Sequence, residues 1–105
     1  MTAQRVDDPM TRAIFDGVTL AESDDVTVVD GMTYFPADTV NRGNLSPSQT
    51  TTRCPWKGEA TYFNVHSPSG SSEDAAFTYL DPSQQAKDAG VEHRIAFWKG
   101  VRIER

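Results

Sequence analysis

The 105-residue chain has a single cysteine, Cys54, which excludes an intrachain disulfide framework. Its two histidines, His66 and His93, lie far from that cysteine in the sequence and do not complete the three or four ligands of a zinc site. We therefore expect neither a bound metal nor a cofactor. No apolar run approaches the ~20 residues of a membrane span, and the N-terminus has no apolar signal core. These absences predict a cytoplasmic protein without a membrane partner.

Clustered positive charge is also missing. The chain has 10 Lys and Arg against 15 Asp and Glu, a net charge of −5, and its basic residues are scattered between Arg5 and Arg105. Nucleic-acid binding needs a concentrated basic face to neutralise phosphates. We therefore expect no nucleic-acid partner, while the oligomeric state stays open.

No segment carries a helical hydrophobic period long enough for a βαβ crossover, which excludes a doubly wound parallel sheet. Short apolar segments instead alternate with turn residues about every ten positions. Asp16-Gly17, Asp24-Asp25 and Asp30-Gly31 are each flanked by strand-forming residues, which predicts a meander of hairpins. We predict an all-β, mainly antiparallel domain, compact and single, with about eight short, strongly bent strands and one or two helical turns.

Domain limits follow from the same pattern. Residues 1–10 are polar and aperiodic and are expected to form a flexible leader, and residues 11–105 are expected to form the β domain. Residues 66–74 are rich in Ser, Gly and Pro and predict a loop. Residues 82–89 lack a clean apolar face and predict a surface turn or a short helix. Residues 91–103 are expected to form a last hairpin around Lys99-Gly100.

Established catalytic motifs are missing as well. The sequence contains no Gly-x-Gly-x-x-Gly and no phosphate loop with a lysine after repeated glycines. Adjacent acidic residues occur at 7–8, 24–25 and 73–74, but neighbouring carboxylates on a strand point to opposite faces, so we interpret them as solvated turns.

The segment Cys54-Pro55-Trp56-Lys57-Gly58 carries the most chemistry. Pro55 fixes φ directly after the thiol, and Gly58 permits a φ that other residues resist, which predicts a rigid turn. A nearby ammonium such as that of Lys57 would favour the Cys54 thiolate. The alternative is an inert, buried cysteine with Lys57 in solvent.

Other polar side chains lie in apolar surroundings and could share a pocket with this turn, because buried tyrosine hydroxyls need hydrogen-bond partners. Plain core packing is the competing interpretation. These candidates are Glu22, Tyr34, Tyr62 and Tyr79.

Several of these segments together resemble a known family, the domain of unknown function 427, whose members are small and mainly bacterial. The resemblance covers about residues 11–104 and rests on the following motifs, in chain order: Ala21-Glu22-Ser23, Tyr34-Phe35-Pro36, Thr52-x-Cys54-Pro55-Trp56-Lys57-Gly58-x-Ala60-x-Tyr62, Tyr79-x-x-Pro82, and Ile95-Ala96-Phe97-Trp98-Lys99-Gly100-Val101.

Asp30 stands where the family commonly has Glu, and Phe77 stands where it commonly has Trp. The resemblance implies a compact all-β domain of strongly bent antiparallel sheets. Some members carry a nucleotidyltransferase label. Such an enzyme needs clustered carboxylates holding Mg²⁺ beside a turn that grips a triphosphate, and Gly70-Ser71-Ser72-Glu73-Asp74 lacks a third aligned carboxylate.

Three functions remain. The first is a binding domain for a small molecule or peptide, with a pocket near the Cys-Pro-Trp-Lys-Gly turn. Its candidate binding residues are Glu22, Asp30, Tyr34, Cys54, Lys57, Tyr62 and Tyr79. The second is an enzyme whose catalytic nucleophile or redox thiol is Cys54, activated by Lys57. The third is a passive interaction module presenting Trp56 and Trp98.

Lys57 has three possible settings, and each predicts a different result of mutation. In a pocket, its charge meets an anion or the Cys54 thiolate. On the surface, its removal is neutral. Paired inside with Glu22 or Asp30, its removal strands a buried carboxylate at a cost of about 3 kcal/mol.

Overall fold

A computed structural model describes residues 10–104, so the leader predicted for residues 1–10 lies, apart from Met10, outside the described residues. This part of the chain contains nine strands, two 3₁₀ turns and one short α-helix. The strands are β1 (Thr11–Phe15), β2 (Val18–Ser23), β3 (Thr27–Val29), β4 (Met32–Pro36), β5 (Leu45–Cys54), β6 (Gly58–Ser67), β7 (Gly70–Tyr79), β8 (Arg94–Phe97) and β9 (Arg102–Glu104). The helix is α1 (Gln84–Ala89), and the 3₁₀ turns are η2 (Ala37–Thr39) and η3 (Arg42–Asn44).

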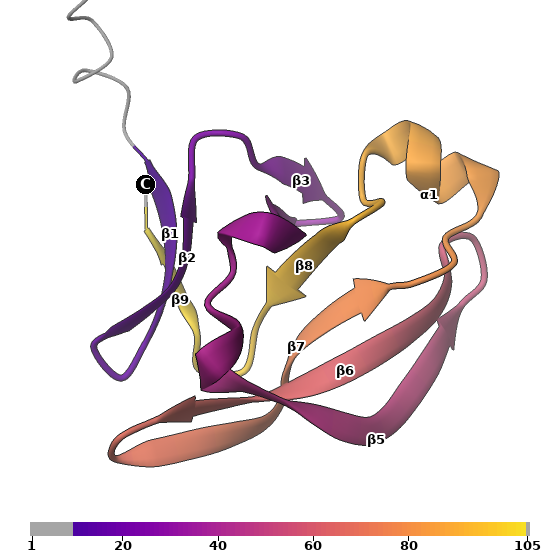
Figure 1. The fold of residues 1–105 in the computed structure, drawn as a ribbon. Helices are drawn as coiled ribbons and strands as arrows, with labels where there is room; N and C mark the ends of the chain where they lie inside the picture. The colour runs from indigo at the N-terminus through magenta and orange to yellow at the C-terminus, as the bar shows by residue number, and fades with distance from the viewer. Residues whose placement is uncertain (1–9, 105) are drawn as a thin grey trace, which may run out of the picture.

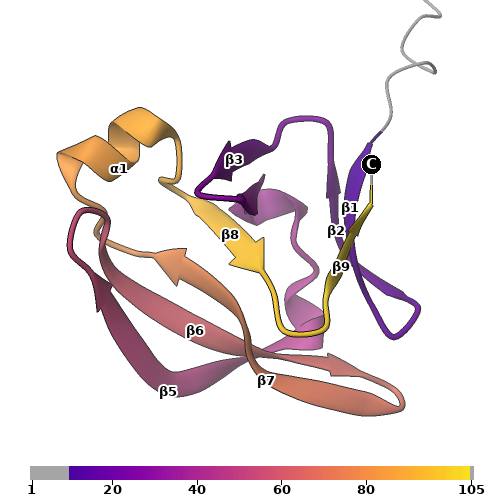
Figure 2. The same cartoon turned by 180° about the vertical axis from the view of Figure 1, so that it is seen from behind.

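The strands form two antiparallel sheets (Figure 1). The smaller sheet has the order β2-β1-β9, and the larger has the order β3-β4-β8-β7-β6-β5. The start of β1 and the end of β9 lie side by side (Figure 2). The predicted all-β antiparallel domain is confirmed, with nine strands in place of about eight.

Two of the three predicted hairpin turns are present. Asp16 and Asp30 have a φ of 53°, and Gly17 and Gly31 a φ of 80°. This pair of positive φ values is what a tight two-residue hairpin turn requires. These turns join β1 to β2 and β3 to β4.

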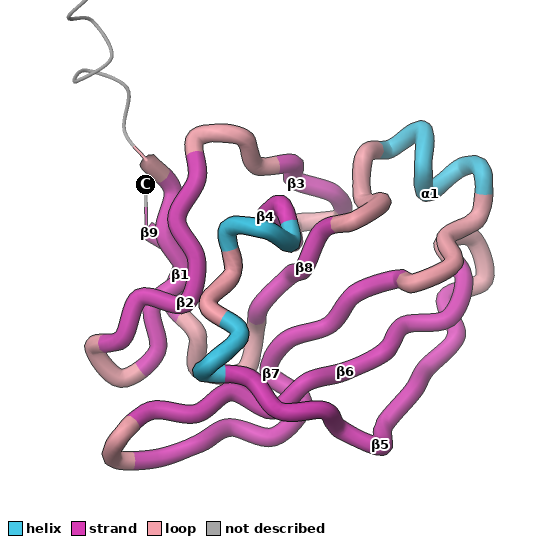
Figure 3. The backbone as a smooth tube through the Cα atoms, in the orientation of Figure 1, coloured by secondary structure: helices cyan, strands magenta, loops and turns pink. Residues whose placement is uncertain are grey.

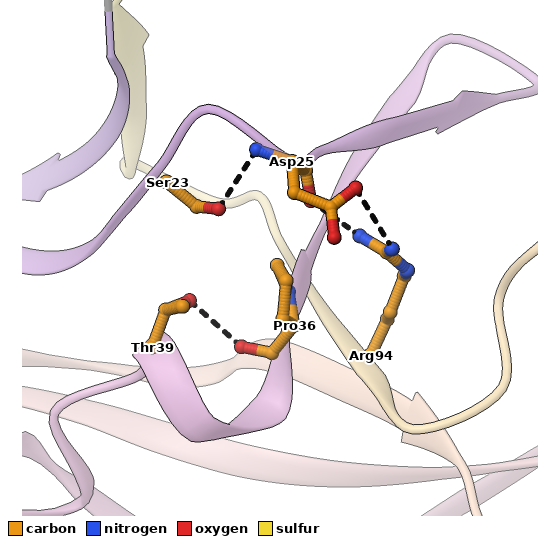
Figure 4. A network of polar contacts seen from close by, with 5 residues as sticks. All are labelled: Ser23, Asp25, Pro36, Thr39 and Arg94. Carbon is orange, nitrogen blue, oxygen red and sulfur yellow. Dashed lines mark hydrogen bonds and ion pairs between the residues drawn. The ribbon is translucent and has the colours of Figure 1, made fainter.

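The hairpin predicted at Asp24-Asp25 is wrong, because β2 and β3 belong to different sheets. The chain crosses between the sheets here, and the side chains of Ser23 and of the distant Arg94 hold the crossing (Figure 4). Arg94 at the start of β8 donates to the Asp25 carbonyl at 2.6 Å and lies 3.3 Å from its carboxylate. Ser23 Oγ accepts from the Asp25 N–H at 2.9 Å.

The last predicted hairpin is also wrong. β8 pairs with β4 and β7, and β9 pairs with β1, so residues 98–101 pass from one sheet to the other. The loop predicted over residues 66–74 is shorter than expected, since β6 and β7 extend to Ser67 and Gly70 and leave a two-residue tip. Their backbone hydrogen bonds outweigh the loop-forming composition.

The short-helix alternative for residues 82–89 is confirmed by α1. Ser83 caps its N-terminus by accepting from the Ala86 N–H at 3.1 Å, and Gly90 ends it with a φ of 93°. The two 3₁₀ turns lie between β4 and β5 (Figure 3).

The six-stranded sheet buries both of its faces, because successive side chains of a strand alternate between them. One face packs against the small sheet in a core that contains Leu20, Phe35, Ile95 and Phe97. The opposite face packs under α1 and the turn between β5 and β6. No helix of residues 10–104 is long and apolar enough to cross a membrane.

Candidate functional site

The turn between β5 and β6 is held rigidly against α1. Cys54 and Gly58 pair across it, and Gly58 has a φ of 112°, as expected from the sequence. A Cβ at Gly58 would lie 3.2 Å from the Asp81 carbonyl oxygen, so glycine is required for space as well as conformation. Ser83 donates its N–H to the Lys57 carbonyl at 2.9 Å and its hydroxyl to the Trp56 carbonyl. The residue that caps α1 therefore also fixes the turn.

This anchoring directs Lys57 inward. Its side chain is 7% exposed, and its Nζ lies 3.1 Å from an Asp30 carboxylate oxygen. The ammonium donates to the Tyr34 hydroxyl at 3.4 Å. It also lies 5.1, 5.8 and 5.7 Å from the ring centroids of Trp56, Tyr34 and Tyr79. Lys57 thus fills a box of three aromatic rings, closed at the rim by Asp30.

Burial changes the acidity of two tyrosines in this box. It raises the pKa of Tyr34 to about 12, against an opposing hydrogen bond from Tyr79. It also raises the pKa of Tyr79 to about 12, with Lys57 acting in the opposite direction. Both phenols therefore stay neutral well into alkaline solution, as hydrogen-bonding groups.

Replacing Lys57 by methionine is expected to lower the free energy of unfolding by about 1 kcal/mol. The substitution keeps a long apolar stem but removes the contacts between the ammonium and the three rings. It also relieves the cost of burying a charge, which offsets part of that loss. Asp30 is 60% exposed, so its carboxylate is not stranded in the interior. Urea unfolding of the two proteins measures the difference.

The companion variant is Asp30→Asn, which is expected to cost at least as much as Lys57→Met because it leaves the buried ammonium without its carboxylate. A loss near 3 kcal/mol for Lys57→Met would contradict this setting and would indicate a partner stranded in low dielectric.

Cys54 lies at the end of β5, partly buried against the same apolar cluster. Within residues 10–104 no hydrogen bond joins its thiol to Lys57, whose ammonium contacts Asp30 and Tyr34 instead.

Beyond the box, the same sheet face carries a second group of rings. The ring centroids of Tyr62 and Phe77 are 5.5 Å apart, and the Trp98 indole lies 6.5 Å from Tyr62 and 6.1 Å from Phe77. Phe77 also contacts Tyr34 and Tyr79 edge to face, which joins the two groups. Trp98 is 39% exposed. We call the surface formed by Tyr62, Phe77 and Trp98 the aromatic face.

Polar side chains surround the aromatic face. Trp98 Nε1 donates to the Asp74 carbonyl at 2.6 Å, which fixes the indole. Ser48 and Thr50 donate to the two Asp74 carboxylate oxygens at 2.5 and 2.9 Å and lower the pKa of that carboxyl. The Thr52 hydroxyl lies 3.0 Å from the Tyr62 hydroxyl.

This polar rim was not among the sequence predictions, which assigned no strand to residues 45–48. The signal is the alternation of Ser46, Ser48, Thr50 and Thr52, which places four hydroxyls along one side of β5 once that strand is recognised.

The structure brings six of the seven candidate binding residues to one face of the large sheet. Glu22 is the exception, because it lies in the small sheet, where it pairs with Arg12 at 2.7 Å. His66 lies on β6 and contacts the Ser46 hydroxyl at 2.6 Å, and His93 is exposed before β8. No group of three or more His, Cys, Asp or Glu in the described part of the chain is arranged to hold a metal ion.

Comparison with known families gives one match. The family described as "Domain of unknown function (DUF427)", labelled NTP_transf_9, matches residues 5–105. A search of curated proteins finds no match.

Proposed function

The chain belongs to the DUF427 family, and we propose that it binds a small, uncharged ring compound on the aromatic face beside the Cys-Pro-Trp-Lys-Gly turn. One observation carries this proposal. Trp98 is 39% exposed, yet its indole is fixed by a hydrogen bond to Asp74 and by contacts with Tyr62 and Phe77. A large, immobilised and solvent-facing ring loses little entropy when a ligand stacks on it.

The chemistry around the aromatic face favours an uncharged ligand. The Asp74 carboxylate is kept ionised by the hydroxyls of Ser48 and Thr50, and the whole chain has a net charge of −5. Both repel an anion. The Thr52 and Tyr62 hydroxyls offer hydrogen bonds to the edge of a stacked ring.

Lys57 has a supporting role in this proposal. Its ammonium is already paired with Asp30 and enclosed by the three rings of the box. It therefore holds those rings in place and does not recognise an anion.

The test titrates the protein with benzamide, uridine and methyl glucoside, three uncharged ring compounds of different chemistry. Binding is followed by tryptophan fluorescence and by the NMR signal of the Trp98 indole N–H. Trp98→Ala is expected to weaken the binding of the preferred compound at least about tenfold, a loss of ~1.4 kcal/mol. Val28→Ala is the matched control, because it removes an apolar side chain, 52% exposed, that lies on β3 outside the aromatic face.

The proposal fails if none of the three compounds shifts the Trp98 indole signal. It also fails if Trp98→Ala and Val28→Ala affect binding equally. Circular dichroism of both variants establishes that the fold is unchanged.

A further inference from the structure

A separate cleft lies on the opposite face of the six-stranded sheet. Its volume is about 190 Å³, and residues of the segment with the two 3₁₀ turns line it together with residues of β6, β7 and β8. The lining residues are Ala37, Arg42, Phe63, Thr78, Tyr79, Leu80, His93 and Ile95. Most of this lining is apolar or aromatic, and Arg42 supplies a full positive charge.

Arg42 has no carboxylate partner in the part of the chain that the structure describes. Its guanidinium lies 5.8 Å from the centroid of the Phe63 ring, which orients it at the cleft. By contrast, Arg12, Arg94 and Arg102 each pair with a carboxylate at 2.7 to 3.3 Å. The Arg42 charge is therefore available to a ligand.

We propose that this cleft binds a small molecule in which a carboxylate is attached to an apolar group. A guanidinium presents paired N–H donors that match the two oxygens of a carboxylate. Leu80, Ile95 and Phe63 would surround the apolar group. The volume is smaller than the ~300 Å³ of a drug-sized pocket, which limits the ligand to about one ring.

Acidic residues near the other end of the cleft favour binding of the ligand's carboxylate at the Arg42 end. Asp38 and Glu92 line an adjoining open cleft of about 400 Å³, which shares Ala37 and His93 with the first. Glu92 lies 3.9 Å from Lys87, so its charge is partly compensated. A ligand with a second negative group would meet these acids and is disfavoured.

The experiment titrates the isotope-labelled protein with benzoate and follows backbone amide signals by NMR. Benzoate is expected to shift the amides of Thr78 and Ile95 at millimolar concentration. Benzamide, which has the same shape without the charge, is expected to shift them at least about tenfold more weakly. The Trp98 indole signal reports separately on the aromatic face, so this result and that of the proposed function are independent.

Two arginine variants give the matched comparison. Arg42→Met is expected to weaken benzoate binding about tenfold, whereas Arg53→Met, which removes the same charge from an exposed position on β5, is expected to leave it unchanged. Arg42→Lys keeps the charge without the paired donors, and its affinity for benzoate is expected to lie between those of Arg42→Met and Arg53→Met. Equal affinity of Arg42→Met and Arg53→Met, or equal binding of benzoate and benzamide, would overturn the proposal.

Discussion

Replacing Tyr34 by alanine is expected to lower the free energy of unfolding by about 3–5 kcal/mol. Tyr34 is fully buried on β4, and its ring meets Phe77 edge to face at 6.1 Å. The same ring is one wall of the box around Lys57. Its removal leaves a cavity beneath a buried ammonium, so the packing and the polar contact are lost together. Urea unfolding measures the change.

Two control variants separate the contribution of the Tyr34 hydroxyl and the effect of truncating an exposed side chain from this loss of stability. Tyr34→Phe keeps the ring but removes the hydroxyl that accepts from Lys57, and it is expected to cost about 1 kcal/mol. Val28→Ala truncates a 52% exposed side chain of the neighbouring strand β3 and is expected to cost under about 0.5 kcal/mol. A Tyr34→Ala loss as small as that of Val28→Ala would show that the box does not support the fold.

The second large effect is a loss of stability in alkaline solution. The pKa values of Tyr34 and Tyr79 are raised to about 12 in the folded protein, from an unfolded value near 10. Between these values the unfolded chain has released both phenolic protons and the folded chain still binds them. The free energy of unfolding therefore falls as pH rises through this window, by up to about 1.4 kcal/mol per pH unit for each tyrosine. The stabilising contribution of the two tyrosines is fully present below pH ~10.

Urea unfolding between neutral pH and about pH 12 tests this expectation. In Tyr34→Phe one of the two shifted phenols is absent, so the slope between pH ~10 and pH ~12 should fall to roughly half. Phenolate absorbance gives a second measurement, since Tyr34 and Tyr79 should ionise only near pH 12 or on unfolding. An identical slope of unfolding free energy against pH in Tyr34→Phe and the original protein would contradict the raised pKa of Tyr34.

Much of the local structure could be predicted from the sequence. Asp16-Gly17 and Asp30-Gly31 form tight turns because both residues of each pair tolerate positive φ. The rigid turn around Lys57 followed from Pro55 and Gly58, whose backbone preferences do not depend on the rest of the chain.

The candidate site was predictable only in part. Its residue types were recognisable, because tyrosines in apolar segments and a lysine in a stiff turn need partners. The partner of Lys57 was left open between Glu22 and Asp30, and the structure selects Asp30 because Glu22 lies in the other sheet. Neither Asp74 nor the hydroxyls of β5 could be assigned without knowing that β5 begins at Leu45.

By itself, the sequence determined the elements and turns whose energies depend on neighbouring residues: the Asp-Gly hairpins, the cap of α1 at Ser83 and the alternating strand faces. Only the tertiary structure decided which strands pair. Asp24-Asp25 and Lys99-Gly100 look like hairpin turns locally, yet both segments cross between sheets. Strand pairing depends on contacts between distant segments, such as that of Arg94 with Asp25, and on burial of both faces of the large sheet. The free energies of such contacts do not depend on any short segment of the chain alone, so local sequence does not predict them.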